Sequence, residues 1–252
     1  MDGAIVNKTE QVRLAFDKPE TYLSRSAFEI RIRRETVQEL VSPPCDARIL
    51  DIGCGDGSIS LPFLTEKTRV TLVDLSSSML SIAKSKASPE LAGNVETINQ
   101  DFMKASFEPS SFDVIFCIGV LAHVVSPSAF IEKMVPLLKP GGSIVIECTD
   151  SNQVLYIFES LFYKVWGLLR PAKYTSFKEV PYREIAKILC RYGLQPKTVF
   201  RYIAPLPGVH RLFGQDWLYR FTRRVFGRAK ANRNAWLGNE YLCLFAPMNT
   251  AA

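Results

Sequence analysis

Arg48-Ile49-Leu50-Asp51-Ile52-Gly53-Cys54-Gly55-Asp56-Gly57-Ser58 is the stretch of this chain that decides its fold. Its first half is a short apolar run, which is typical of a buried parallel strand. Three glycines on alternate positions then let the backbone turn where a side chain would crowd it. Ser58 and the apolar residues after it predict a helix that begins at once. The turn would then lie against a helix N-terminus, whose free N–H groups favour a polar ligand such as a nucleoside-bearing cofactor.

The next two strands predicted from the sequence also end in acidic residues. Residues 69–74 form a strand that ends at Asp74, 21 residues beyond Gly53. An acid at this place can accept hydrogen bonds from both hydroxyls of a ribose, although it could also cap the helix that follows. Leu75 and Met79 begin that helix and can flank an adenine. The third strand, 95–102, ends at Asp101 and Phe102, which can accept from the adenine amino group and pack on its ring. For Asp101, an Asx-turn that ends the strand is the structural alternative.

A fourth strand, residues 112–118, leads into a loop that carries His123. Ligands of an open parallel sheet lie beyond the carboxyl ends of its strands, so we expect Cys117, Ile118 and the loop to face the ligand. Histidine titrates near neutrality, so His123 could act as a general base toward an acceptor. It could equally pack beneath the cofactor, and the sequence leaves both roles open.

Three motifs together resemble one family. They are Asp51-x-Gly53-x-Gly55-x-Gly57, the V-D-L-S-S-S-M-L run that contains Asp74, and the L-K-P-G-G turn at 138–142. In this order they resemble the class I, Rossmann-like S-adenosylmethionine-dependent methyltransferases that act on small-molecule or lipid acceptors. The resemblance covers about residues 48–150.

The resemblance implies a fold, a cofactor and a set of contacts. The fold is a doubly wound α/β domain with a seven-stranded, mostly parallel sheet in the order 3-2-1-4-5-7-6. The co-substrate is S-adenosylmethionine, with no metal, and the methyl group goes to an O, N or C atom of a small, apolar or lipid-like acceptor. The residues expected to contact the cofactor are Asp51, Gly53, Cys54, Gly55, Gly57, Asp74, Leu75, Met79, Asp101, Phe102, Cys117 and Ile118.

Two other kinds of protein remain as alternatives. An NAD-dependent oxidoreductase is disfavoured because its glycine pattern is G-x-G-x-x-G rather than the spacing found here. A non-catalytic cofactor-binding or scaffold protein would keep the same cofactor residues, so the sequence does not exclude it. Two histidines and six scattered cysteines offer no familiar zinc spacing, and the cysteines suit a reducing compartment.

The sequence divides into a core and additions around it. We expect an N-terminal helical lid at 1–45, the cofactor-binding core at 46–150 and an inserted helix at 151–180. Residues 181–252 would complete the sheet and carry a basic helical insertion at 204–240. The resemblance implies that this lid covers the ligand, with Tyr22 or one of Arg25 and Arg31 near it. The alternative is a solvated helix packed on the edge of the sheet.

The charge of the chain is unevenly distributed. Residues 1–150 hold 15 basic and 20 acidic side chains, whereas residues 151–240 hold 16 and 5. Segment 216–230 is predicted to be an amphipathic helix whose apolar face carries Trp217, Leu218, Phe221 and Val225. The opposite, wet face would carry Arg220, Arg223, Arg224, Arg228 and Lys230. This pattern predicts either peripheral contact with an anionic membrane or a lid whose charged side faces water. Nucleic-acid binding is disfavoured because no known module accompanies the charge. No targeting segment is evident, so we expect the cytoplasm; the oligomeric state stays open.

Overall fold

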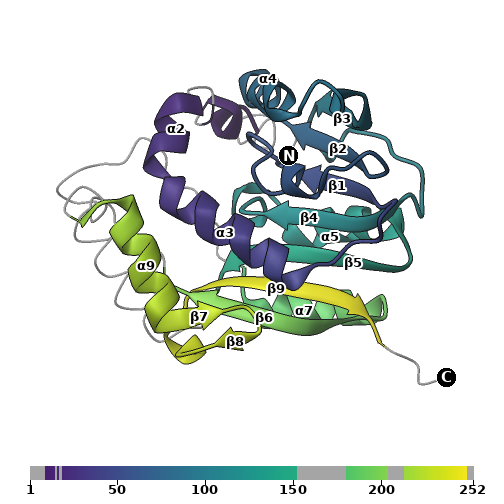
Figure 1. Cartoon of the computed structure of the whole chain (residues 1–252). Helices are drawn as coiled ribbons and strands as arrows, with labels where there is room; N and C mark the ends of the chain where they lie inside the picture. The colour runs from purple at the N-terminus through teal and green to yellow at the C-terminus, as the bar shows by residue number, and fades with distance from the viewer. Residues whose placement is uncertain (1–8, 15, 17–18, 152–179, 204–212, 249–252) are drawn as a thin grey trace.

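A seven-stranded sheet runs through the described part of the chain (Figure 1). The computed structural model describes residues 9–14, 16, 19–151, 180–203 and 213–248. The strand order is β3-β2-β1-β4-β5-β9-β6, with β1–β5 parallel and β9 antiparallel to both of its neighbours. The strands are β1 (Arg48–Ile52), β2 (Arg69–Asp74), β3 (Val95–Asn99), β4 (Phe112–Ile118), β5 (Leu138–Thr149), β6 (Leu194–Tyr202) and β9 (Glu240–Pro247). The predicted fold and strand order are confirmed, and β9 is the strand that the prediction numbered seven.

Helices cover both faces of the sheet, as a doubly wound fold requires (Figure 1). One face carries α5 (Pro127–Met134) and α7 (Tyr182–Arg191). The other carries α3 (Ala27–Leu40), α4 (Ser77–Lys86) and α9 (Gln215–Phe226), with α2 (Pro19–Arg25) leading into α3. The helices α3 and α9 come from opposite ends of the chain and lie side by side.

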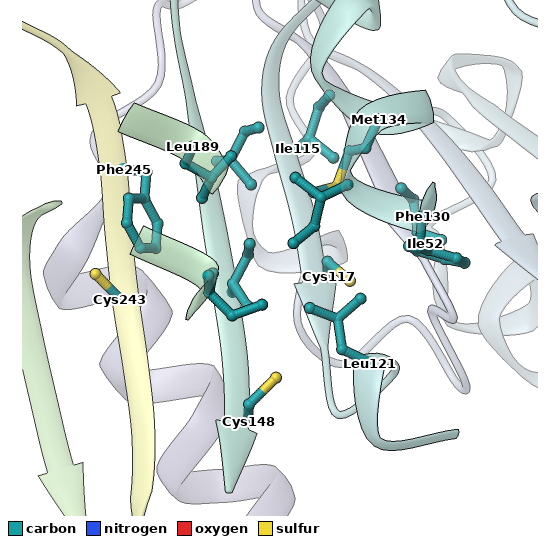
Figure 2. Packing of buried hydrophobic residues seen from close by; sticks show 14 of the residues in the cluster. Ile52, Ile115, Cys117, Leu121, Phe130, Met134, Cys148, Leu189, Cys243 and Phe245 are labelled. Carbon is teal, nitrogen blue, oxygen red and sulfur yellow. The ribbon is translucent and has the colours of Figure 1, made fainter. Parts of the chain in front are cut away.

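The central strands supply both halves of the core because successive side chains of a strand point to opposite faces. In β4, Ile115 and Cys117 pack with Phe130 of α5 and Leu189 of α7 (Figure 2). Their neighbours Val114 and Phe116 pack on the other face, against α3. Because both faces are buried, β4 is a nearly continuous apolar run, as expected for a central parallel strand.

The prediction of a helix directly after the glycine turn is wrong. The chain instead makes turns and one short 3-10 helix, η1 (Leu61–Phe63). Pro62 has no N–H to continue a hydrogen-bond ladder, and Leu64 already has an extended backbone. The turn therefore has no α-helix N-terminus behind it, and the N–H groups of Gly53, Cys54, Gly55 and Gly57 form hydrogen bonds within the protein.

The basic helix is shorter than predicted and faces differently. It ends at Phe226 because Gly227 has φ +75°, and the chain then forms a hairpin of β7 (Gly227–Arg228) and β8 (Ala231–Asn232). Arg228 and Lys230 therefore lie on the hairpin. Arg223, assigned to the wet face, is largely buried instead and forms ion pairs with Glu35 and Glu39 of α3.

Other expectations can be only partly compared with the structure. The N-terminal lid is helical at α2 and α3. Nearly all of the expected helix at 151–180, and 204–212 of the basic insertion, lie outside the described residues. Where the structure describes the chain, no helix has the length and apolarity needed to cross a membrane.

Candidate functional site

A cavity of about 710 Å³ opens beyond the carboxyl ends of β1, β2 and β4. This volume lies within the range of small-molecule and cofactor sites. The tips of the strands form one wall, and α2 and α3 form another. Eight of the residues predicted to contact a cofactor line it: Gly53, Gly55, Asp74, Leu75, Met79, Asp101, Phe102 and Ile118.

Asp74 joins the tip of β2 to the glycine turn. One carboxylate oxygen accepts the Gly55 N–H at 2.8 Å, and the other accepts the Ser76 N–H at 2.8 Å. Burial raises the pKa of Asp74, and these backbone N–H groups oppose the rise. A carboxylate has about four acceptor positions, so Asp74 can hold the turn and still accept bonds from a ligand in the cavity.

Asp51 lies behind the turn rather than in the cavity wall. It is buried and accepts a hydrogen bond from Ser60 Oγ at 2.6 Å. Burial raises the pKa of Asp51 to about 7, although the Ser60 bond opposes the rise. The remaining predicted contacts outside the lining are Cys54, Gly57 and Cys117. Burial raises the pKa of both thiols, so they are neutral side chains behind the strand tips.

We expect Asp51 to make stability fall as pH rises. The folded protein keeps the Asp51 proton up to about pH 7, whereas an unfolded chain loses it near about pH 4. The stabilisation is therefore complete below about pH 4 and is lost as pH rises through about 7. Asp51→Asn should remove this slope, so urea unfolding should show the variant gaining stability relative to wild type across that window.

Asp113 provides the control with the opposite sign. Burial raises its pKa, but the Arg48 N–H and Lys139 outweigh this and hold the pKa below its usual value. Asp113→Asn should therefore lose stability relative to wild type as the pH rises through the lowered pKa of Asp113 to the usual pKa of an aspartate, and the difference should stay constant above it. Parallel pH profiles of wild type and Asp51→Asn would contradict the assignment for Asp51.

Gly53 is the glycine of the turn that most clearly excludes a side chain. Its φ is +68°, and a Cβ there would lie 2.4 Å from Val120 Cγ2. We expect Gly53→Ala to reduce the free energy of unfolding by about 1–3 kcal/mol, because it adds both strain and a clash. Gly93→Ala is the control, since its Cβ would meet nothing within 4 Å and the position needs no positive φ. Equal losses in urea unfolding would contradict the prediction.

The far end of the cavity combines a carboxylate with apolar side chains. Asp101 accepts the Met103 N–H at 2.9 Å in a local Asx-type turn, and both residues line the cavity. The Phe102 ring lies 4.8 Å from the Phe130 ring, measured between centroids, so the core holds it in place. This end therefore offers an acceptor beside fixed apolar surface, as an adenine requires.

The lid brings a different arginine to the cavity from those that the sequence indicated. Tyr22, Ser26, Glu29 and Arg33 line the wall formed by α2 and α3. Arg31 is directed away and pairs with Glu35 and Asp216, and Arg25 does not line the cavity. The spacing of Ser26, Glu29 and Arg33 places them on one face of a helix, which is a signal that could have identified Arg33.

Arg33 is held by a buried carboxylate at the end of β5. Arg33 Nε donates to Glu147 Oε1 at 2.7 Å, and the Tyr202 hydroxyl donates to the same oxygen at 3.2 Å. Glu147 is 1% exposed, and its Oε2 has no hydrogen-bond partner among the described residues. Burial, with the nearby Glu147 charge, raises the pKa of Glu240 and so favours its neutral form. The Arg33–Glu147 pair is therefore the main buried charge pair beside the cavity.

His123 also reaches the cavity. It ends the 3-10 helix η3 (Leu121–His123) and lines the site. Its ring makes an edge contact with Phe16, with 5.8 Å between the centroids, and Phe16 makes a similar contact with Tyr22. The histidine is thus placed between the end of β4 and the lid. Among the described residues, no group of three or more His, Cys, Asp or Glu side chains could hold a metal ion.

One known protein family matches the part of the chain that carries the strand tips of the cavity. Residues 49–142 match the family model described as a methyltransferase domain. They contain the glycine turn, Asp74, Asp101 and His123, which are the parts of the cavity contributed by the strand tips.

Curated proteins that are similar to this chain include ubiquinone biosynthesis O-methyltransferases. That of Paraburkholderia phymatum is 37% identical over 112 residues, which is 44% of this chain and 48% of that protein. That of Coxiella burnetii is 32% identical over 110 residues, or 44% and 47% of the two chains. The chain thus spans about half the length of these relatives.

Solved structures resemble this chain over nearly its whole length. Magnesium protoporphyrin IX methyltransferase from Synechocystis, with bound S-adenosylhomocysteine, has a TM-score of 0.64 at 17% identity and covers 96% of this chain and 100% of its own. A possible histamine N-methyltransferase from Thermotoga maritima has a TM-score of 0.63 at 16% identity, with 93% and 98% covered. A [4+2]-cyclase has a TM-score of 0.63 at 14% identity, with 95% and 96% covered. These likenesses show the fold alone.

Proposed function

We propose that this protein transfers a methyl group from S-adenosylmethionine to a small, apolar or lipid-like acceptor and releases S-adenosylhomocysteine. The observation that carries the proposal is the single cavity in which the glycine turn, Asp74 and Asp101 lie together with the lid residues. Its volume of about 710 Å³ suits a nucleoside cofactor with an acceptor beside it. The motif order within 49–142 supports the same reading.

Different residues of the site fit different parts of the cofactor. Asp74 would accept hydrogen bonds from the ribose, and Leu75, Met79, Asp101 and Phe102 would hold the adenine. The glycine turn would give the backbone close access to the amino-acid end. Asp51, Cys54, Gly57 and Cys117 would support these contacts from behind, since they do not line the cavity.

The bound cofactor supplies an electrophilic methyl group on a sulfonium. The protein's contribution is therefore mainly to align an acceptor atom with the methyl–sulfur bond and to exclude water. His123 is placed to accept a proton from a hydroxyl or ammonium acceptor, and it lies beside the lid that closes the site. The proposal holds with or without that proton transfer, because alignment alone accelerates the reaction.

The acceptor side of the cavity favours an amphiphilic molecule. Val12, Phe16, Val124 and Val125 supply apolar wall, and Arg33 with Glu29 supplies one polar corner. A lipid-like acceptor with one polar head matches this division. The curated relatives are named as O-methyltransferases of ubiquinone biosynthesis, and that supports a lipid-like acceptor here.

We also propose a cytoplasmic enzyme that makes peripheral contact with an anionic membrane through residues 216–230. All six cysteines are free, which suits a reducing compartment. A lipid-like acceptor would be found at a membrane surface, and the basic balance of residues 151–240 favours an anionic one.

Turnover measured with separated acceptor pools tests the proposed function. The full chain is incubated with S-adenosylmethionine and either a lipid extract or a water-soluble extract of cells, and S-adenosylhomocysteine is measured. We expect product with the lipid extract. Saturable cofactor binding without turnover in either pool would favour the scaffold alternative, and NADH binding without S-adenosylmethionine binding would favour the oxidoreductase.

A further inference from the structure

Three aromatic rings form a stacked row on the outer face of α9. Trp217 and Phe221 are four residues apart, so they lie on one side of α9, and Phe213 lies two residues before that helix begins. The Phe213 and Trp217 ring centroids are 4.7 Å apart, and those of Trp217 and Phe221 are 5.1 Å apart, with interplanar angles of 25° and 8°. The exposed fractions are 52%, 46% and 48%. We call these three rings the aromatic row.

Contiguous exposed aromatic surface needs an explanation that a single exposed ring does not. Isolated apolar residues are common on protein surfaces, whereas contiguous patches mark sites of interaction. Each ring of the row already contacts its neighbour and still leaves about half of its surface exposed. Aromatic side chains on a helix face are typical of helices that lie in a membrane interface.

Basic side chains accompany the aromatic row on the same face. Arg220 is three residues after Trp217, Arg224 is three residues after Phe221, and both are exposed. On a helical wheel both arginines lie on the side of Trp217 that is away from Phe221, while Leu218, Thr222 and Phe226 are buried on the opposite side of the helix. Residues 213–234 hold six basic side chains and one acidic one, Asp216. Asp216 pairs with Arg31, Arg223 pairs with Glu35 and Glu39 on the inner face, and Arg228 pairs with Glu39. The positive charge beside the rings therefore comes from Arg220 and Arg224.

The inner face fixes the helix in one orientation. Leu218 and Phe226 pack in the core, and Arg223 pairs with Glu35 and Glu39 of α3. The Tyr219 hydroxyl donates to Glu35 as well. The aromatic row and its arginines therefore form a preorganised surface, which does not have to fold when it binds.

The start of α9 is tied to the wall of the cavity. The Gln215 side chain donates to the carbonyl of Arg25 at 3.0 Å and accepts the Phe28 N–H at 2.9 Å, across the junction of α2 and α3. Ser26, at that junction, lines the cavity. A surface that binds the aromatic row is therefore also close to the lid.

We propose that the aromatic row, with Arg220 and Arg224, is the site at which this protein docks on an anionic lipid bilayer. This deepens the proposed function, on which it rests in one respect: docking brings the lid close to the layer that holds a lipid-like acceptor. The aromatic rings enter the interfacial region of the bilayer, and the arginines contact lipid phosphates. Positive charge next to apolar rings favours this partner over a second copy of the chain, whose matching face would carry the same charge.

Vesicle sedimentation with the full chain tests the docking site. Phosphatidylcholine vesicles are compared with vesicles that also contain phosphatidylglycerol. We expect wild type to bind the anionic vesicles and the double variant Arg220→Glu/Arg224→Glu to bind them at least about 10-fold more weakly. Trp217→Ser/Phe221→Ser should also lose at least about 10-fold, since the rings supply buried apolar area.

The matched control is Lys187→Glu/Arg191→Glu, which makes the same charge change at exposed positions on α7. It should bind anionic vesicles within about 3-fold of wild type, a factor well below that expected for the arginines of α9. An equal loss in the control would mean general charge attraction and would overturn the proposal. So would unchanged binding of the aromatic variant, or failure of wild type to bind anionic vesicles.

Two further measurements separate this proposal from its rivals. A concentration-dependent dimer that Trp217→Ser/Phe221→Ser dissociates, without vesicle binding, would assign the face to a second copy and overturn the proposal. S-adenosylmethionine binding is measured for every variant and should match wild type, because none of the altered residues lines the cavity. Vesicle binding that depends on the aromatic row in a chain that does not bind S-adenosylmethionine would support the docking site while the proposed function fails.

Discussion

Asp74→Ala is expected to weaken S-adenosylmethionine binding by about 100-fold or more while the sheet still forms. Each hydrogen bond to a charged group contributes about 1.5–3 kcal/mol, and a factor of 100 corresponds to about 2.7 kcal/mol. The substitution removes the acceptor for the ribose and also the bond that Asp74 makes to the Gly55 N–H. The turn therefore loses one of its hydrogen bonds to β2, while the Gly53 and Cys54 N–H groups still bond to the Val73 carbonyl.

Calorimetric titration of the variant with S-adenosylmethionine measures the effect, and circular dichroism checks the fold. Asp74→Asn distinguishes the two causes, because the amide oxygen can still accept one backbone N–H but carries no charge. Asp113→Ala is the control, since it removes a carboxylate at the far end of β4 that pairs with Lys139 outside the cavity. Unchanged affinity in Asp74→Ala would remove Asp74 from the cofactor site.

Arg33→Met is expected to reduce the free energy of unfolding by about 3–5 kcal/mol, the range for removing one partner of a buried ion pair. The Arg33 side chain is 17% exposed, and Glu147 is 1% exposed. Without the guanidinium, the Glu147 charge would stay buried with only the Tyr202 hydroxyl as its described partner. Water cannot compensate this charge as it compensates one at the surface.

The double variant Arg33→Met/Glu147→Leu should recover most of that loss, because it removes both charges and keeps apolar volume. Arg31→Met is the matched control two residues away. Its side chain is 41% exposed, and its pairs with Glu35 and Asp216 lie at the surface, so a loss of about 1 kcal/mol is expected. Urea unfolding of the four proteins measures the set. A double variant no more stable than Arg33→Met, or equal losses at the two arginines, would contradict the prediction.

Membrane docking and the lid meet at one structural feature, the contact between α3 and α9. Arg223 holds α9 to α3 through Glu35 and Glu39, so an experiment that changes Arg223 would alter the packing of the fold as well as its charge. This is why the docking test changes Arg220 and Arg224 and leaves Arg223 in place. The sequence pattern alone had grouped all three arginines on one wet face.

The sequence by itself determined the sheet and the wall of the cavity that the strand tips form. Glycines at 53, 55 and 57, an acid ending the second strand and another after the third are local signals, because each acts within one strand and the turn after it. The parallel order of the strands then brings their tips to one edge without further information. For this reason Gly53, Gly55, Asp74 and Asp101 were all found from the chain alone, and all line the cavity.

Only the tertiary structure decided which lid and insertion residues face inward. Arg25, Arg31 and Arg33 look alike in sequence, and positions 31 and 33 are about 200° apart around a helix, so the rotation of α3 on the sheet selects between them. That rotation is set by Phe28 and Ile32 packing against the core, and it places Arg33 beside Glu147, a residue 114 positions away. In the same way, packing of α9 on α3 buried Arg223 and left Trp217 and Phe221 exposed, since contacts between distant helices carry no signal within either helix alone.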